Sequence, residues 1–193
     1  MEKGILVDDL VLIGGSAGSL DVLLQILPAL RPDVQAAIIL VLHRKATSET
    51  VLTQLLKQRT SLPVRDVEEK DHIWPGVIYV SPGDYHLLFE SDGTLSLDDS
   101  ERILYSRPSI DVSFESAAMI YGSRLTCILL SGANTDGSEG MLFARKEGAY
   151  TIAQTPDSAE LPLMPKAAID NGAAMIEMQP SEILSFLNSR KRL

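Results

Sequence analysis

The 193-residue chain contains only one cysteine, Cys127, so neither an intrachain disulfide bond nor a paired-cysteine metal or redox site can form. Cys127 lies within an apolar run, residues 125–130, which predicts a small buried side chain in a strand rather than a reactive thiol. Residues that carry chemistry must therefore be sought elsewhere in the sequence.

Long hydrophobic runs are also missing. The longest, residues 36–42, is far shorter than the roughly 20 residues that span a bilayer. The first ten residues contain no basic region followed by an apolar stretch, so they do not resemble a signal peptide. These absences favour a cytoplasmic protein, and the length and the lack of a linker favour one domain over residues 1–193.

Basic residues are scarce relative to acidic ones, with 17 Lys and Arg against 26 Asp and Glu and a net charge of −9. This balance argues against non-specific binding of nucleic acid and gives no general attraction to anionic lipid. It leaves room for a local basic site, for which Arg44 and Arg107 are the candidates.

What the chain does contain is a repeated alternation of strand-like and helix-like segments. Strands are predicted at residues 10–13, 36–42, 125–130, 150–153 and 174–178, and helices at residues 19–30, 48–59, 109–121, 137–147, 165–171 and 181–187. Such alternation predicts an α/β fold with a doubly wound, mainly parallel sheet and helices on both faces. Short alternating segments between residues 67 and 99, including 77–80, predict a small antiparallel hairpin at one edge of this sheet.

One segment combines a serine with the glycines that a sharp turn needs. Residues 14–18 read Gly-Gly-Ser-Ala-Gly and connect the first predicted strand to the first predicted helix. This arrangement is typical of a nucleophile elbow, in which the hydroxyl of Ser16 projects above the sheet and the N–H of Ala17 faces a developing oxyanion. Two other roles stay open for the motif: Ser16 as a helix N-cap, or the glycines as a phosphate-binding loop.

A nucleophilic serine needs a base, and the chain has three histidines, His43, His72 and His86. His43 directly follows the strand at 36–42, so it lies at the sheet edge where ligands and chemistry gather in open α/β folds. His72 lies in a polar run and His86 in the hairpin region, so their positions give less support for a role as the base. Alternatively, His43 is a capping or hydrogen-bonded histidine.

Asp136 is the candidate for the acid that orients the base, because it follows the end of the strand at 125–130. Alternatively, Asp136 and Glu139 form a capping box that opens the next helix. The chain order Ser16, His43, Asp136 differs from the Ser, Asp, His order of ordinary α/β-hydrolases.

This order and its local motifs resemble the catalytic domain of the bacterial chemotaxis receptor methylesterases, the CheB family, over about residues 10–187. The resemblance rests on these segments: Ile13-Gly14-Gly15-Ser16-Ala17-Gly18, Val41-Leu42-His43, Pro75-Gly76 with Tyr79-Val80-Ser81-Pro82-Gly83-Asp84 and His86, Arg107-Pro108-Ser109-Ile110-Asp111-Val112, Leu130-Ser131-Gly132 with Asp136-Gly137 and Gly140-Met141, and Met164-Pro165-Lys166-Ala167-Ala168.

The resemblance implies a serine carboxylic ester hydrolase that removes methyl groups from glutamate γ-methyl esters of chemotaxis receptors and that also deamidates receptor glutamines. Ser16 would be the nucleophile, His43 the base and Asp136 the orienting acid, with no metal or organic cofactor. Backbone N–H groups of Ala17 and Ala133 would bind the oxyanion, and Arg107 and Met164 would border the substrate. The implied partner is the cytoplasmic helices of a methyl-accepting receptor, without nucleic acid or membrane insertion.

The sequence departs from the family pattern in the loop that carries the acid. The family usually has more glycine there and a methionine where Ala133 stands, and Asn134 and Thr135 also differ. Many members carry an N-terminal receiver domain, whereas about ten residues precede the first strand here. Control by phosphorylation within this chain is therefore not expected. The alternatives are a free-standing, constitutively open domain, a domain regulated by a separate regulatory or receiver protein, or a segment of a longer protein. The alternative function is a catalytically weak docking module in a chemosensory complex.

Overall fold

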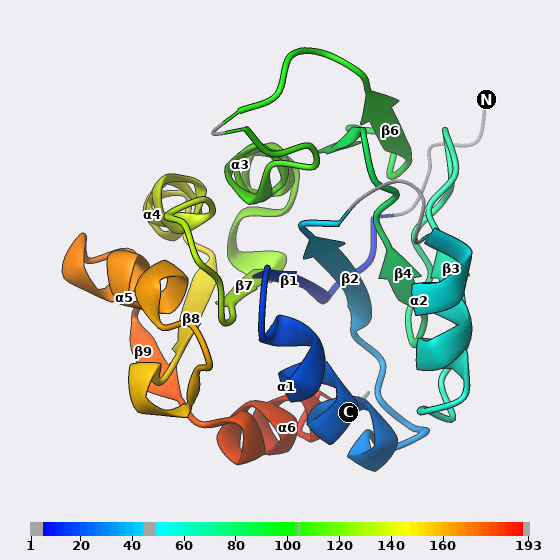
Figure 1. Cartoon of the computed structure of the whole chain (residues 1–193). Helices are drawn as coiled ribbons and strands as arrows, with labels where there is room; N and C mark the ends of the chain where they lie inside the picture. Colours follow the sequence, from blue (N-terminus) through cyan, green and yellow to red (C-terminus); the bar gives the residue numbers. More distant parts are fainter. Residues whose placement is uncertain (1–5, 45–48, 104, 191–193) are drawn as a thin grey trace.

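Seven parallel strands form one sheet in the computed structural model, which describes residues 6–44, 49–103 and 105–190 (Figure 1). The order across the sheet is β3-β4-β2-β1-β7-β8-β9. The strands are β1 (Leu10–Gly15), β2 (Ala37–Leu42), β3 (Val64–Asp66), β4 (Ile78–Val80), β7 (Leu125–Leu129), β8 (Tyr150–Gln154) and β9 (Ile176–Met178). The central strands β1, β2 and β7 are buried at every position, as expected of parallel strands covered on both faces.

Helices cover both faces of the sheet and divide the core into two apolar layers. The first layer packs α3 (Ile110–Tyr121), α4 (Ser138–Lys146) and α5 (Leu163–Asp170) against the sheet. The second packs α1 (Ser19–Ile26), α2 (Glu49–Lys57) and α6 (Pro180–Asn188) against the other face. The described residues also include the short 3₁₀ helices η1 (Leu27–Ala29), η3 (Gly122–Arg124) and η4 (Pro156–Ser158). The predicted doubly wound α/β fold is confirmed.

A separate two-stranded antiparallel sheet pairs β5 (His86–Phe89) with β6 (Leu95–Asp98). It packs on α3, where the N–H of Phe89 donates to Oγ of Ser116 at 2.8 Å. The predicted hairpin is therefore present, but the assignment of residues 77–80 to it was wrong. Ile78–Val80 instead pairs in parallel with β2 and β3, because all three of its side chains are buried within the main sheet.

The topology brings the residues after β1, β2 and β7 to one edge of the sheet. Gly15 is paired with Leu42, and Gly14 with Leu129, so the carboxyl ends of the three strands are level. The N–H of His43 donates to the carbonyl of Gly15 at 3.1 Å, which ties the residue after β2 to the end of β1. Within the described parts of the chain, no helix is long and apolar enough to cross a bilayer.

The helices α3 and α4 approach each other closely at Gly140. A Cβ atom at this position would lie 2.6 Å from Cα of Asp111, closer than any ordinary contact. We therefore expect Gly140→Ala to force the two helices apart and to lower the free energy of unfolding by about 1–3 kcal/mol. Chemical denaturation measures this loss, with the exposed α4 substitution Lys146→Ala as the control. Equal stability of the two variants would contradict the prediction.

Candidate active site

Ser16 lies in the turn between β1 and α1, and its backbone is fixed on both sides. Its N–H donates to the carbonyl of Ser131 at 2.9 Å, and its carbonyl accepts from N–H and Oγ of Ser19 at 3.0 and 2.5 Å. The side chain of Ser16 does not cap α1, because the N-cap residue is Gly18 and no side-chain cap is made. The half-buried Ser16 thus keeps its hydroxyl at the surface of the turn, as an elbow requires.

Gly18 explains why the turn is so tight. Its φ of 80° is in the left-handed region that favours glycine, and a Cβ atom there would lie 2.6 Å from Oγ of Ser131. That hydroxyl already donates to the carbonyl of Ala17 at 2.8 Å and accepts from the N–H of Leu161 at 3.0 Å. The elbow is therefore clamped against the loop that follows β7.

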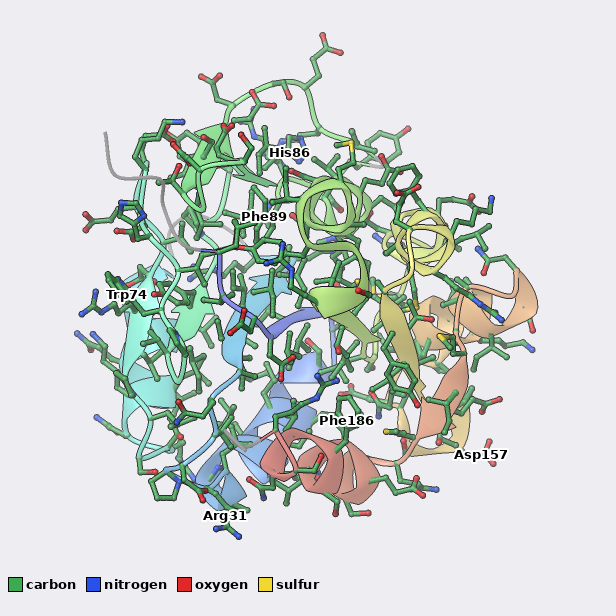
Figure 2. The ribbon with its side chains drawn as sticks, turned by 180° about the vertical axis from the view of Figure 1, so that it is seen from behind. Arg31, Trp74, His86, Phe89, Asp157 and Phe186 are labelled. Atoms are coloured by element: carbon green, nitrogen blue, oxygen red, sulfur yellow. The ribbon has the colours of Figure 1, made fainter. Side chains whose placement is uncertain are left out.

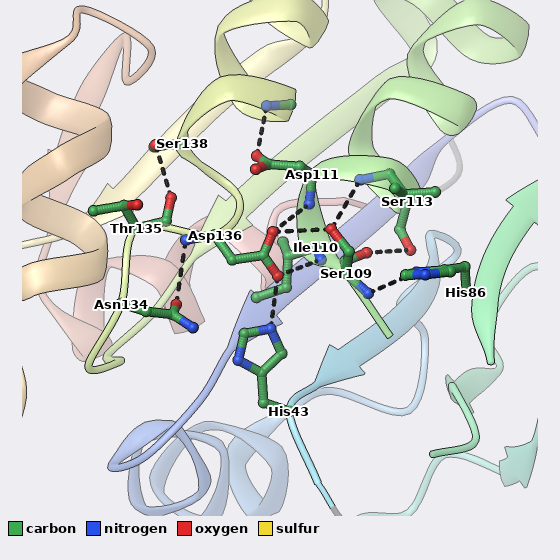
Figure 3. Close-up of polar contacts among 12 residues, drawn as sticks. His43, His86, Ser109, Ile110, Asp111, Ser113, Asn134, Thr135, Asp136 and Ser138 are labelled. Atoms are coloured by element: carbon green, nitrogen blue, oxygen red, sulfur yellow. Dashed lines mark hydrogen bonds and ion pairs between the residues drawn. The ribbon is translucent and has the colours of Figure 1, made fainter. Parts of the chain in front are cut away.

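His43 and Asp136, which are 93 residues apart in the sequence, are joined by a direct hydrogen bond. His43 Nε2 lies 2.7 Å from Asp136 Oδ2 (Figure 3). The side chain of His43 is 12% exposed, and that of Asp136 is fully buried. The imidazole thus has one edge fixed by a buried carboxylate and remains accessible to a small molecule, as a base oriented by an acid must be.

The carboxylate of Asp136 is held by the N-terminus of α3 rather than by α4. It accepts from Oγ of Ser109 and from the N–H groups of Ile110 and Asp111 at 3.0, 2.8 and 3.1 Å. The N-cap of α4 is Gly137, without a side-chain cap, so the alternative capping box of Asp136 and Glu139 is not formed. The positive end of α3 and its free N–H groups stabilise the negative charge.

These contacts decide the protonation of Asp136. Burial raises its pKa, but the hydrogen bonds from His43, Ile110 and Asp111 outweigh burial, and the net result is a lowered pKa. The group is therefore ionised at neutral pH. An ionised carboxylate is the form that can stabilise a protonated imidazole beside it.

Asp111 is a second carboxyl group beside the first, and its pKa is raised to about 7 by burial and by the charge of Asp136. Its Oδ1 accepts from the N–H of Gly140 at 2.7 Å. A raised folded-state pKa means that the folded protein binds more protons than the unfolded chain between pH about 4 and about 7, so stability falls as the pH rises through this range.

Asp111→Asn should remove this loss, because an amide oxygen still accepts from Gly140 but carries no charge. We expect the variant to have a flatter dependence of unfolding free energy on pH between about 4 and 7. Denaturant titrations at a series of pH values measure it. A dependence as steep as that of the unmodified protein would rule out Asp111 as its source.

A pocket of about 270 Å³ opens beside Ser16 and His43. The residues that line it with them are mostly apolar and come from α1, α2 and the end of β2: Ser19, Leu20, Leu42, Arg44, Val51, Leu52 and Leu55. The predicted nucleophile and base therefore share one cavity, and the acid lies behind the base.

Comparison with known proteins agrees with this geometry. Residues 11–187 match the family described as CheB methylesterase. The chain belongs to the CheB methylesterase family. A protein of Leptospira interrogans named "Putative protein-glutamate methylesterase/protein-glutamine glutaminase" is 39% identical over 160 residues, which cover 83% of each chain. The family and the enzyme class predicted from the sequence, protein-glutamate methylesterase, are confirmed.

Other relatives in the CheB methylesterase family are longer than this chain. The protein-glutamate methylesterase/protein-glutamine glutaminase of Symbiobacterium thermophilum is 35% identical, and the match covers 86% of this chain but 46% of that protein. The crystal structure of the Thermotoga maritima CheB methylesterase catalytic domain superimposes with a TM-score of 0.91 at 29% identity, over 95% of this chain and 99% of that one. The fold of this chain is thus that of a CheB catalytic domain.

The predicted site residues Ala17, Ala133 and Met164 are not among those that line the pocket. Ala17 and Ala133 are exposed in the two loops that Ser131 joins. The side chain of Met164 is fully buried beneath Gly132, whose carbonyl accepts from the N–H of Met164 at 3.1 Å. Met164 thus supports the loop from below.

The two candidate basic residues are both engaged with backbone carbonyls. Arg107 donates to the carbonyls of Asp99 and Ser100 at 2.5 and 2.7 Å and lies 3.9 Å from Asp84. Arg44 lines the pocket with its side chain 7% exposed and donates to the carbonyl of Ser81 at 2.7 Å. Both guanidinium groups therefore hold local loops together.

Sequence reasoning missed the residues that hold the acid in place. Ser109 and the first turn of α3 bind Asp136, from which they are separated by 25 to 27 residues in the sequence. No hydrophobic periodicity or motif spacing predicts such a contact. The motif that contains Ser109 was recognised only as part of the resemblance to the CheB family. Among the described residues, no group of three or more His, Cys, Asp or Glu side chains is arranged to hold a metal ion.

Proposed function

We propose that this chain is a protein-glutamate methylesterase in which Ser16 is the nucleophile, His43 the general base and Asp136 the acid that orients it. The observation that carries the proposal is the 2.7 Å bond from His43 Nε2 to a buried, ionised carboxylate, in a pocket that Ser16 also lines. A serine, a base and an orienting acid in this relation are the parts required for acyl transfer.

The orientation of the His43 imidazole indicates which of its two nitrogens carries the proton. Nε2 faces Asp136, an ionised acceptor, so Nε2 carries the ring proton of the neutral imidazole. Nδ1, which is separated from Nε2 by one ring carbon, then has the lone pair and does not face Asp136 (Figure 3). Nδ1 is therefore the atom that takes the proton from the hydroxyl of Ser16 as the serine oxygen attacks the ester carbonyl.

The oxyanion that forms in this attack needs two N–H donors near the serine. Within the described residues, the backbone N–H groups of Ala17 and Ala133 have no acceptor in the protein. Both belong to loops held against each other by Ser131, so their positions relative to Ser16 are fixed. Backbone donors also explain why the side-chain differences from the family in this loop are compatible with catalysis.

The reaction then proceeds in two steps, acylation of Ser16 and hydrolysis of the acyl-enzyme. The C–O bond to the methoxy group breaks, methoxide takes the proton from His43 and leaves as methanol, and the glutamyl group remains as an ester of Ser16. Water attacks this ester as His43 accepts a proton from it, the bond between Ser16 Oγ and the glutamyl carbonyl carbon breaks, and Oγ takes the proton back from His43. The products are the glutamate carboxyl group and free Ser16. A glutamine side chain would follow the same path with ammonia as the first product.

The proposed substrates are esterified glutamates and glutamines of methyl-accepting chemotaxis receptors, on their cytoplasmic helices. The apolar lining of the pocket fits the uncharged ester better than the charged product, which assists release of the product. We further propose that the single domain acts in the cytoplasm and that a separate protein regulates it. A docking module without catalysis would predict a buried Ser16 or a separated triad, and both the half-exposed Ser16 and the His43–Asp136 bond argue against it.

Methanol release from methylated chemoreceptor membranes tests the proposal, with a simple methyl ester and glutamine-containing receptor as parallel substrates. Rapid release from the receptor relative to the simple ester is the expected result, with slower ammonia release from glutamine. Hydrolysis of the simple ester alone would indicate a different esterase. No release in any assay by the folded protein would remove the proposed activity.

A further inference from the structure

His86 is a buried histidine outside the pocket, at the start of β5, and its side chain has a hydrogen-bond partner on each ring nitrogen. Only 1% of the residue is exposed. Its position is labelled in Figure 2. Nδ1 lies 3.0 Å from the backbone nitrogen of Ser109, and Nε2 lies 3.0 Å from the carbonyl oxygen of Glu101. Neither partner can exchange its role, because the N–H can only donate and the carbonyl can only accept. His86 is therefore neutral, with its proton on Nε2.

One of these two bonds leads directly to the catalytic acid. Ser109 is the N-cap of α3, and its Oγ donates to Asp136 Oδ1 at 3.0 Å (Figure 3). Asp136 in turn binds His43 at 2.7 Å. His86 thus fixes the backbone of the residue whose side chain fixes the acid. The other bond leads away from the site, to the chain segment that follows β6.

The N–H of Ser109 depends on His86, because Ser109 is fully buried and its N–H precedes the first residue of α3. A buried N–H without an acceptor is costly, so the backbone at residue 109 would rotate to find another partner. That rotation would also move Oγ of Ser109 and the N–H groups of Ile110 and Asp111, the three donors that bind Asp136.

We propose that His86 is a positioning residue of the esterase: by accepting from the N–H of Ser109, it sets the first turn of α3 at the angle that holds Asp136 against His43. The proposal rests on the assignment of Ser16, His43 and Asp136 as the catalytic residues. It predicts that the bond at Nδ1 matters for turnover and that the bond at Nε2 matters only for stability.

Two amide substitutions separate the two bonds. The side-chain oxygen of asparagine takes the place of Nδ1, so His86→Asn keeps an acceptor for Ser109 and loses the donor to Glu101. The terminal nitrogen of glutamine takes the place of Nε2, so His86→Gln keeps the donor to Glu101 and loses the acceptor. Each variant therefore loses one buried hydrogen bond, and thermal unfolding is expected to give similar losses of stability for both.

The expected difference between them is in kcat. We expect roughly a tenfold lower kcat for His86→Gln than for His86→Asn, with KM little changed, because the acid is misplaced while the pocket is intact. The proton shared by His43 and Asp136, observed as a low-field ¹H resonance, should persist in His86→Asn and broaden or shift in His86→Gln. Equal kcat values, or a lower value for His86→Asn, would overturn the proposal.

The ring of His86 in the unmodified protein gives a measurement that does not depend on the variants folding. Nitrogen NMR of labelled histidine should show a neutral ring with the proton on Nε2 at neutral pH. A ring with its proton on Nδ1, or a charged ring, would overturn the proposal. If the unmodified protein has no esterase activity, the proposed function is refuted. The role of His86 is still tested in that case, by the low-field resonance and by the tautomer of its ring.

Discussion

Replacing Ser16 by alanine is expected to abolish ester hydrolysis and to leave the fold intact. Loss of the nucleophile in a serine triad costs many orders of magnitude, and we expect kcat/KM to fall by roughly 10⁴-fold or more. The backbone bonds of Ser16 to Ser131 and Ser19 are available to any residue, so the free energy of unfolding should change by less than about 0.5 kcal/mol. Methanol release and thermal unfolding measure the two quantities.

Ser19→Ala is the matched control for this experiment. Ser19 lines the same pocket, and its hydroxyl donates to the carbonyl of Ser16, so the substitution removes one hydroxyl from the same turn but leaves the nucleophile in place. We expect the control to lose little activity, less than roughly tenfold. Turnover by Ser16→Ala comparable to that of the unmodified protein would remove Ser16 from the mechanism, whatever the result for Ser19.

The second large effect is expected from Asp136→Asn, which is nearly the same shape but carries no charge. The amide can no longer stabilise a charged His43. Its nitrogen replaces one carboxylate oxygen and cannot accept a hydrogen bond, so the variant loses either the contacts of Oδ1 with Ser109 and Asp111 or those of Oδ2 with Ile110 and His43. We expect kcat to fall by roughly 10³–10⁴-fold and the unfolding free energy by about 2–4 kcal/mol. The loss of turnover should be smaller than that in His43→Ala, which removes the base itself.

Asp157→Asn provides the control. Asp157 is exposed on the surface in η4 (Figure 2), and its substitution changes the net charge by the same amount as Asp136→Asn. The unmodified protein should lose the stability contributed by Asp136 as the pH falls through its lowered pKa, and Asp136→Asn should lack this component of acid unfolding. A greater loss of turnover in Asp136→Asn than in His43→Ala would mean that the acid is assigned wrongly.

The positions of Ser16, His43 and Asp136 could be predicted because each follows a buried apolar strand, and parallel strands deliver their carboxyl ends to one edge. The hydrogen bond between His43 and Asp136 was a hypothesis that the sequence could not test, since capping was an equally ordinary role for each. Only the three-dimensional contacts separate these roles: Asp136 accepts from N–H groups in the first turn of α3, where Ser109 is the N-cap, and does not cap α4.

The parts that could not be predicted depend on contacts between distant segments. Ile78–Val80 was assigned to the hairpin because it is followed by turn residues, whereas burial on both faces places it inside the parallel sheet. Val64–Asp66 at the sheet edge has only one buried residue, so its sequence carries almost no signal for a strand. His86 was judged by its position in the hairpin region, and its link to Asp136 through Ser109 exists only once β5 packs on α3.

The division of the core into two layers has a consequence for the order in which function appears. Ser16, the proposed nucleophile, lies just before α1, which packs on one face of the sheet, whereas Asp136, the proposed acid, is bound by the N-terminus of α3, which packs on the other face. A molecule with a formed sheet and only one docked layer would have most of its secondary structure and no turnover. During refolding, esterase activity should therefore recover only when the second helix layer packs on the sheet. The far-ultraviolet circular dichroism signal, which reports secondary structure, should recover before the activity does.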